Sequence, residues 1–273
     1  MNKTIGIIGF GNMGSAIAEG IKRDYPVIVF DKDQSKTAKI SGVKLAQNNI
    51  DTVKASDIII LAVKPQDFDS LLKEIKNYIN NKLVISIAAG ISTAYIKKIL
   101  GDVRVIRAMP NLPAKIGKGM ICMYKDKSAT DEDLYSCEEL FKKIGKTLIL
   151  DNEDMINNAT AVSGSGPGFF YDMIEGKTKE EIKDFVVSFT EILTDSAINI
   201  GFSKPVAEVL AQTTTSGSIV YLEQMHLSPE EAKKQVASKG GTTEAGLEIL
   251  HKGGSLTEAV KAALKRAQEL SKS

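Results

Sequence analysis

The stretch IIGFGNMG, residues 7–14, limits the possible folds more than any other part of this sequence. Gly9, Gly11 and Gly14 have G-x-G-x-x-G spacing, after an apolar run that predicts a strand and before a predicted helix. In dinucleotide-binding folds these glycines form a tight turn, admit a pyrophosphate and let helix and strand pack closely. The helix start then faces the anion. The stretch predicts such a site, and a glycine-rich turn without a ligand is the alternative.

The first half of the chain alternates between strand-like and helix-like segments. Apolar runs at 27–31, 57–63, 82–89, 103–109, 119–124 and 146–150 predict strands, and strands apolar on both sides indicate a parallel sheet covered on both faces. After about Met155 the pattern is helical, at 178–200, 204–225, 229–237, 242–251 and 255–271. We expect an α/β Rossmann domain with a mostly parallel, doubly wound sheet over residues 1–154. An all-α domain over residues 155–273 should follow.

Composition argues against several function classes. Lys and Arg number 35 against 34 Asp and Glu, so no charge excess suggests nucleic acid or an acidic membrane as a partner. No run of about eighteen apolar residues predicts a membrane span. Cys122 and Cys137 lack zinc-site spacing, so we expect no bound metal and two reduced thiols in a cytoplasmic protein.

Asp31 stands at the end of the second predicted strand. An acid at this position usually bonds the ribose 2′-hydroxyl and favours NAD. Lys32 follows at once and Lys36 lies close by, and either could pair with the 2′-phosphate of NADP. The sequence leaves the choice between the two cofactors open.

Three motifs follow later strands: AVKPQ (62–66), AAG (88–90) and RAMPN (107–111). The carboxyl ends of parallel strands form the crevice where ligands bind. Lys64 is expected beside the nicotinamide, or else it is a solvated side chain. Asn111 could bond the nicotinamide carboxamide, or it could simply form a turn after proline.

The stretch VASKGGTTEAG, residues 236–246, leads into a predicted helix. A helix start exposes backbone N–H groups, and glycines let another molecule come close. The amides of Gly240, Gly241, Thr242 and Thr243 could point at one small anion, with the helix dipole adding to the attraction. A threonine cap is the alternative, although a cap alone does not explain two preceding glycines.

The motifs GFGNMG, AVKP, SIAAG, RAMPN, VSGSGP and SKGGTTEAGL occur in this order along nearly the whole chain. Together they resemble the pyrroline-5-carboxylate reductase family. The resemblance implies a Rossmann domain followed by a helical domain through which subunits pair, as a homodimer or a larger homo-oligomer of dimers. It also implies reduction of 1-pyrroline-5-carboxylate, a cyclic imino acid, to L-proline by hydride transfer from NADPH or NADH, the last step of proline biosynthesis.

The resemblance also implies which residues form the site. The substrate should lie against Ser238, Gly240, Gly241, Thr242 and Thr243, and the Thr243 hydroxyl, with Ser238 beside it, is the catalytic candidate for a hydrogen bond to the ring nitrogen. The cofactor should lie against Gly9, Gly11, Asn12, Met13, Asn49, Val63, Lys64, Ala89 and Glu153. The residues that complete the expected cofactor set are Gly14, Asp31, Lys32, Pro65 and Asn111.

Four features depart from the family pattern. Lys239 replaces a usual proline, Gly168 replaces a small residue that is mostly alanine, and His226 replaces a common glutamate. Residues 171–186 look like an extra segment, which is either solvated or else covers the site or reshapes the subunit interface. A related reductase of another cyclic imino or carbonyl acid, or a non-catalytic dinucleotide-binding regulator, are therefore the alternatives.

Overall fold

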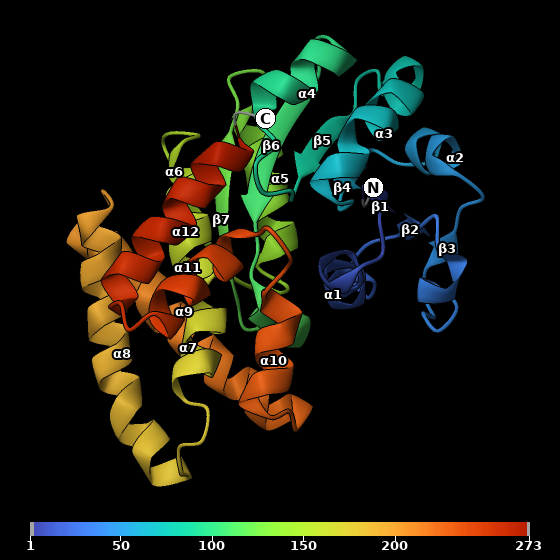
Figure 1. The fold of residues 1–273 in the computed structure, drawn as a ribbon. Helices are drawn as coiled ribbons and strands as arrows, with labels where there is room; N and C mark the ends of the chain where they lie inside the picture. The colour runs from blue at the N-terminus through green and yellow to red at the C-terminus, as the bar shows by residue number, and fades with distance from the viewer. Residues whose placement is uncertain (1–2, 272–273) are drawn as a thin grey trace.

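The computed structural model describes residues 3–271, which contain one twisted sheet and a separate group of helices (Figure 1). The strand order in the sheet is β3-β2-β1-β4-β5-β6-β7-β8. The strands are β1 (Ile5–Ile8), β2 (Val27–Phe30), β3 (Lys44–Leu45), β4 (Ile58–Leu61), β5 (Leu83–Ser86), β6 (Arg104–Met109), β7 (Gly119–Lys125) and β8 (Gly145–Ile149).

The sheet is parallel except where β7 runs antiparallel to β6. Ile7 of β1 pairs with Val29 of β2 on one side and with Ile60 of β4 on the other. The strand order reverses between β1 and β4, which is the point where doubly wound sheets bind their ligands. The mostly parallel α/β architecture expected from the sequence is confirmed.

Helices cover both faces of the sheet because its central strands are apolar on both sides. Ile17 of α1 and Phe141 of α5 belong to the core on one face, and Leu72 of α3 and Ile96 of α4 belong to the core on the other. The helices of this half are α1 (Asn12–Ile21), α2 (Asn49–Lys54), α3 (Phe68–Ile75), α4 (Thr93–Leu100) and α5 (Asp131–Phe141). Short 3₁₀ turns are η1 (Gln34–Lys36), η2 (Pro65–Asp67), η3 (Lys76–Tyr78) and η4 (Leu112–Ile116).

From Met155 to Ser271 the described chain contains helices and no strand. These elements are α6 (Met155–Ala159), the π-helical turn η5 (Thr160–Gly164), α7 (Gly166–Met173), α8 (Lys179–Asn199), α9 (Lys204–Met225), α10 (Pro229–Val236), α11 (Thr242–His251) and α12 (Leu256–Leu270). The five helices expected after residue 178 all form. Capping boxes at Thr178, Ser228 and Ser255 fix three of their starts, because each side chain bonds an otherwise free amide.

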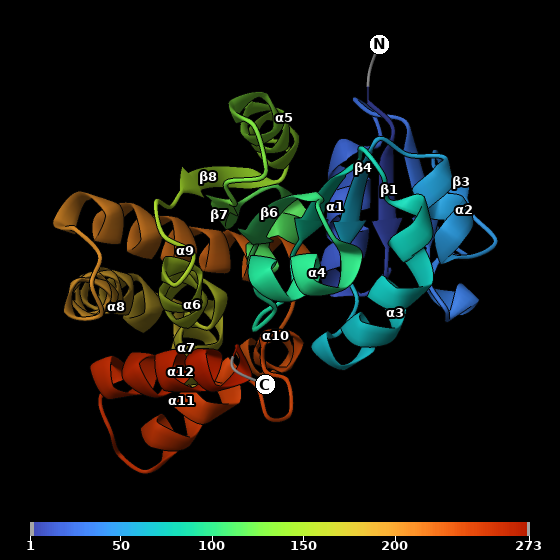
Figure 2. The same cartoon turned by 90° about the horizontal axis from the view of Figure 1, so that it is seen from above.

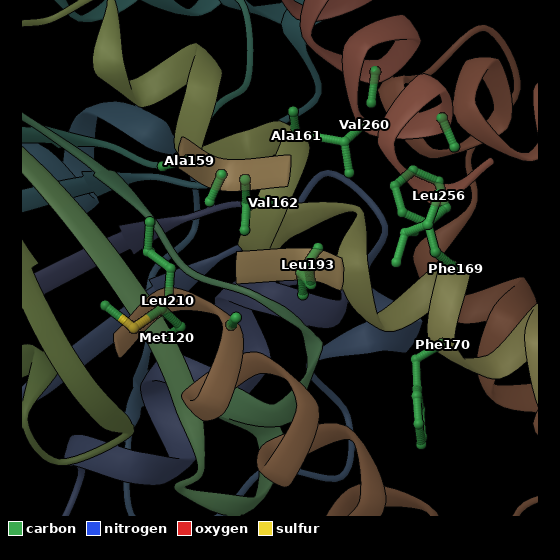
Figure 3. Packing of buried hydrophobic residues seen from close by; sticks show 14 of the residues in the cluster. Met120, Ala159, Ala161, Val162, Phe169, Phe170, Leu193, Leu210, Leu256 and Val260 are labelled. Atoms are coloured by element: carbon green, nitrogen blue, oxygen red, sulfur yellow. The ribbon is translucent and has the colours of Figure 1, made fainter. Parts of the chain in front are cut away.

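The helical group packs against the β6–β8 end of the sheet, away from β2 and β3 (Figure 2). Its core joins Phe169 and Phe170 of α7 to Leu193 of α8 and Leu210 of α9, and it includes Met120 of β7 (Figure 3). Apolar packing therefore continues from the sheet into the helices. None of the helices between residues 3 and 271 is long and apolar enough to cross a membrane.

Residues 171–186 lie within the helical half of the chain. They are the end of α7, a turn and the start of α8. Tyr171 and Ile174 are buried in the helical core, whereas residues 175–181 are exposed. The solvated interpretation therefore describes the middle of this segment, and its beginning is structural.

Candidate functional site

A cavity of about 650 Å³ lies over the carboxyl ends of β1, β2 and β4. This volume falls within the usual range for small-molecule and cofactor sites. Seven of the expected cofactor residues line it: Gly9, Gly11, Asp31, Lys32, Asn49, Val63 and Lys64.

The glycines at the cavity edge have the properties that a dinucleotide requires. Gly9 has φ +97°, and a Cβ atom there would lie 2.6 Å from the Ala62 carbonyl oxygen. A Cβ atom at Gly14 would overlap the Gly9 carbonyl, so α1 can approach β1 only with glycine at this position. Gly11, the N-cap of α1, has nothing within 4 Å of its missing Cβ. This open space at a helix N-terminus fits a bound pyrophosphate.

Asp31 holds the glycine loop by a hydrogen bond to its backbone. Its carboxylate accepts hydrogen bonds from the Phe10 amide at 2.6 Å and the Asp33 amide at 2.8 Å, and Lys36 Nζ lies 3.3 Å away. Burial raises the pKa of Asp31, but these bonds and Lys36 outweigh it and hold the pKa below its ordinary value. Lys32 and Lys36 both line the cavity, where each is paired with an aspartate, Lys32 with Asp67 and Lys36 with Asp31.

The remaining expected cofactor residues lie around the cavity rather than in its lining. Asn12 is exposed at the start of α1, and Met13 packs partly against the sheet core. Pro65 begins η2, and Ala89 follows β5 at the same edge of the sheet. These positions surround the carboxyl ends of β1, β4 and β5.

Glu153 is tied to the start of α4. Its two oxygens accept hydrogen bonds from the amide and the hydroxyl of Thr93, both at 2.7 Å. Arg107 Nη1 lies 3.1 Å from the same carboxylate. The side chain thus positions the loop that contains Ala89. A direct contact of Glu153 with the cofactor remains a prediction.

Asn111 joins the end of β6 to the helical region. Its buried amide donates to the Ser163 carbonyl at 3.0 Å and accepts from the Met120 amide at 2.8 Å. Both ends of the side chain are therefore engaged within the protein.

Residues 238–241 form a tight turn before α11. The Gly241 amide donates to the Ser238 carbonyl at 2.9 Å, and Gly240 has φ +71°. The Gly240 amide donates to the Glu244 carboxylate at 2.6 Å. The expectation that all four amides point at one anion is thus wrong for Gly240 and Gly241, because turn closure and Glu244 occupy them.

The free amides of this segment belong to the next two residues, Thr242 and Thr243. Gly241 is the N-cap of α11 and has no side chain to cap the helix. In the described structure the amides of Thr242 and Thr243 have no hydrogen-bond acceptor, as is usual in a first helical turn. Two adjacent donors at a helix N-terminus suit a carboxylate.

A cluster of hydroxyl groups lies beside these amides. The Thr243 hydroxyl is buried and donates to Ser165 Oγ at 3.2 Å. Ser165 Oγ also lies 3.0 Å from the Thr242 hydroxyl. Sequence reasoning noted the SGSGP motif without singling out Ser165. Ser238 is exposed on the turn, outside this cluster.

Lys115 connects the cofactor side to the helical side. Its Nζ donates to the Asn12 side chain at 3.3 Å and to the Gln235 side chain of α10 at 3.1 Å. Burial lowers the pKa of Lys115. Lys115 thus joins η4 and the start of α1 to α10 of the helical half.

The arrangement contains a cavity edged by the glycine loop, a helix start with two free amides, and a hydroxyl cluster. No group of three or more His, Cys, Asp or Glu side chains within residues 3–271 could hold a metal ion. His226 is exposed in a left-handed helix end. His251 lies 3.0 Å from Asp172 at the far end of α11. Binding and orienting a small acid beside a dinucleotide is the chemistry that these residues support.

Comparisons with known proteins find matches in both halves of the chain. Residues 4–90 match a family model described as NADP oxidoreductase coenzyme F420-dependent, and residues 183–272 match one described as pyrroline-5-carboxylate reductase dimerisation. The pyrroline-5-carboxylate reductase of Synechocystis is 33% identical over 283 residues, covering 100% of both chains. That of Methanosarcina acetivorans is 34% identical, covering 99% of both.

Solved structures extend the similarity to the whole fold. The pyrroline carboxylate reductase of Plasmodium falciparum with NADP bound aligns with a TM-score of 0.64 and 26% identity, covering 99% of this chain and 98% of that one. The pyrroline-5-carboxylate reductase of Coxiella burnetii aligns with a TM-score of 0.66 and 29% identity, covering 100% of both.

Proposed function

Because the chain belongs to the pyrroline-5-carboxylate reductase family, we propose that it reduces 1-pyrroline-5-carboxylate to L-proline, with NADPH or NADH as the hydride donor. The observation that carries the proposal is the pair of free amides of Thr242 and Thr243 at the N-terminus of α11, in a chain whose glycine loop opens on a cavity at the N-terminus of α1. The reaction is the last step of proline biosynthesis.

The residues divide the work between two binding sites. The backbone at Gly11 and the start of α1 would hold the pyrophosphate, and the cavity beside Asp31 and Asn49 would hold the adenosine end. When bound, the nicotinamide supplies the hydride that reduces the imine carbon. The chain's task is to orient the two partners and to exclude water.

The substrate corner would fix the ring by its acid group. The amides of Thr242 and Thr243 would bind the carboxylate, and the Thr243 hydroxyl would face the ring nitrogen. Charge-assisted hydrogen bonds of this kind contribute about 1.5–3 kcal/mol each. A protonated imine is already electrophilic, so no nucleophilic side chain is required.

Subunit pairing is part of the proposal. We propose a homodimer, or a larger assembly of dimers, that covers apolar residues of α8. Val187 is 61% exposed, Ile192 40% and Ile198 37%, within the segment that matches the dimerisation family. Exposed apolar side chains on a helix are compatible with a surface that another chain covers. Light scattering on the purified protein measures the assembly size.

We propose that the protein works in the cytoplasm, because its two cysteines are buried free thiols. We also propose that residues 1–154 bind the cofactor and residues 155–273 supply the substrate and pairing surfaces.

The activity is tested by mixing the purified protein with 1-pyrroline-5-carboxylate and either NADPH or NADH. We expect absorbance of the reduced nicotinamide to fall and L-proline to accumulate in equal amount. No oxidation with either cofactor would contradict the proposal. Turnover of a different cyclic imino acid alone would identify a related reductase instead.

A further inference from the structure

Gly240 is held on both of its backbone polar groups by charged side chains. Arg266 Nε of α12 donates to the Gly240 carbonyl at 2.8 Å, and the Gly240 amide donates to the Glu244 carboxylate of α11 at 2.6 Å. Arg266 is itself oriented by Glu269, whose carboxylate lies 3.0 Å from Nη1. Two different helices thus hold one residue of the turn.

The type of turn explains why such support is needed. Gly240, at the third position of the turn, has φ +71°. Lys239, at the second position, does not have a positive φ. With the bond from the Gly241 amide to the Ser238 carbonyl, this is a type II turn. Proline is favoured at the second position because its ring fixes φ, and lysine gives no such restraint.

The orientation of this turn decides where the next amides point. Gly241 is the N-cap of α11, and the unpaired amides of Thr242 and Thr243 follow at once. A rotation of the Gly240 peptide would turn the N-cap and move these donors. Hydrogen bonds from a guanidinium are among the stronger restraints on a carbonyl, and Arg266 supplies one here.

We propose that Arg266 is a positioning residue of the substrate site, which fixes the 238–241 turn so that the Thr242 and Thr243 amides face the substrate carboxylate. This inference rests on the proposed function. It assigns Arg266 an action through Gly240, and not a direct contact with the substrate.

The experiment compares Arg266→Met with wild type in steady-state kinetics, thermal unfolding and NADPH titration by fluorescence. We expect the KM for 1-pyrroline-5-carboxylate to rise roughly five- to tenfold, with kcat changed less than about twofold. The Kd for NADPH should stay unchanged, because the cofactor cavity lies elsewhere. Lys265→Met is the matched control, since Lys265 is the exposed neighbour on α12 and forms no hydrogen bond in the described structure.

Two further variants distinguish positioning of the turn from direct attraction between the Arg266 charge and the substrate carboxylate. Adding Lys239→Pro to Arg266→Met should restore most of the lost KM, because proline fixes the turn without replacing the charge. Arg266→Lys, which keeps a charged donor, should stay within about threefold of wild type and remains informative if Arg266→Met does not fold.

The outcomes distinguish the inference from the proposed function. An unchanged KM in Arg266→Met, or no recovery on adding Lys239→Pro, overturns the positioning role while wild-type activity stands. The role is also overturned if Arg266→Met lowers the NADPH affinity and the thermal stability along with the substrate affinity, since that result shows general destabilisation. If wild type itself oxidises neither NADPH nor NADH with this substrate, the proposed function fails and the inference fails with it.

Discussion

Arg107 and Glu153 form an ion pair at the junction of the sheet and the helical region, with Nη1 and Oε1 3.1 Å apart. The Arg107 side chain is only 2% exposed, and its Nε and Nη2 atoms are buried without a hydrogen-bond acceptor. Burial lowers the pKa of Arg107, and Glu153 opposes that change. The buried guanidinium therefore has its ion pair with the Glu153 carboxylate, which also accepts a hydrogen bond from the Thr93 amide at the start of α4.

Glu153→Gln should destabilise the fold by about 2–4 kcal/mol, because it leaves the buried Arg107 guanidinium without an opposite charge. Arg107→Met should cost less, since Glu153 keeps both bonds to Thr93. The double variant should be more stable than Glu153→Gln alone. Urea unfolding monitored by circular dichroism measures the three free energies. Equal losses in both single variants would contradict this dependence.

Thr243→Val keeps the shape of the side chain and removes its hydroxyl. We expect kcat/KM for 1-pyrroline-5-carboxylate to fall about tenfold to a hundredfold, the effect of losing 1–3 kcal/mol of transition-state stabilisation. Steady-state kinetics measure the change. Thr243→Ser, which retains the hydroxyl, is the control and should keep most of the activity. A valine variant with wild-type kinetics would remove Thr243 from the reaction.

Gly168→Ala tests the packing behind the substrate corner. A Cβ atom at Gly168 would lie 2.5 Å from Thr243 Cγ2, so the threonine must move. Alanine in a helix gains about 1 kcal/mol over glycine, whereas overpacking costs about 1–3 kcal/mol. We expect a slightly lower unfolding free energy and a several-fold higher KM for the imino acid. An unchanged KM with higher stability would show that the corner adapts.

Asp31→Asn tests whether this acid selects the cofactor or supports the loop. Because its carboxylate bonds the Phe10 and Asp33 amides, we expect the Kd values for NADPH and NADH to rise by similar factors. Fluorescence titration with each cofactor measures both constants. A selective gain for NADPH would instead show that Asp31 repels the 2′-phosphate.

Asp126 gives a pH dependence to stability. Burial raises its pKa, but bonds from Ser128 and Lys97 outweigh this and lower the pKa from 3.8 to about 2. A lowered carboxyl pKa stabilises the fold above the unfolded value, and this contribution disappears as pH falls from about 4 to about 2. The stability difference between wild type and Asp126→Asn should therefore shrink over that range in thermal unfolding. Asp102→Asn, at an exposed carboxylate without an ion pair in the described structure, is the control.

The elements with strong local signals could be predicted from the sequence. The Gly9–Gly14 motif and the capping residues of the later helices determine local structure through contacts with residues close to them in the sequence. β3 was missed because it has two residues, Lys44 and Leu45, both exposed. A strand this short has no apolar pattern.

The parts of the site that depend on distant contacts could not be predicted. The pairing of Arg107 with Glu153 and of Ser165 with Thr243 joins residues far apart in the chain. A charge inside the apolar run VRVIRAM was a signal for Arg107, since buried arginine needs a partner. Nothing local indicated that Glu244 would occupy the Gly240 amide, because that depends on how the turn closes.

The π-helical turn η5 sets the angular register of α7. Its wider winding accommodates one residue more than a regular helix would, just before Ser165. Each residue of an α-helix turns the chain by about 100°. Inserting one further residue between Thr160 and Gly164, wound as regular helix, would therefore turn the Ser165 hydroxyl by about that angle, away from Thr242 and Thr243, without changing the identity of any residue in the cluster. The geometry of the hydroxyl cluster depends on how many residues precede it as well as on their identity.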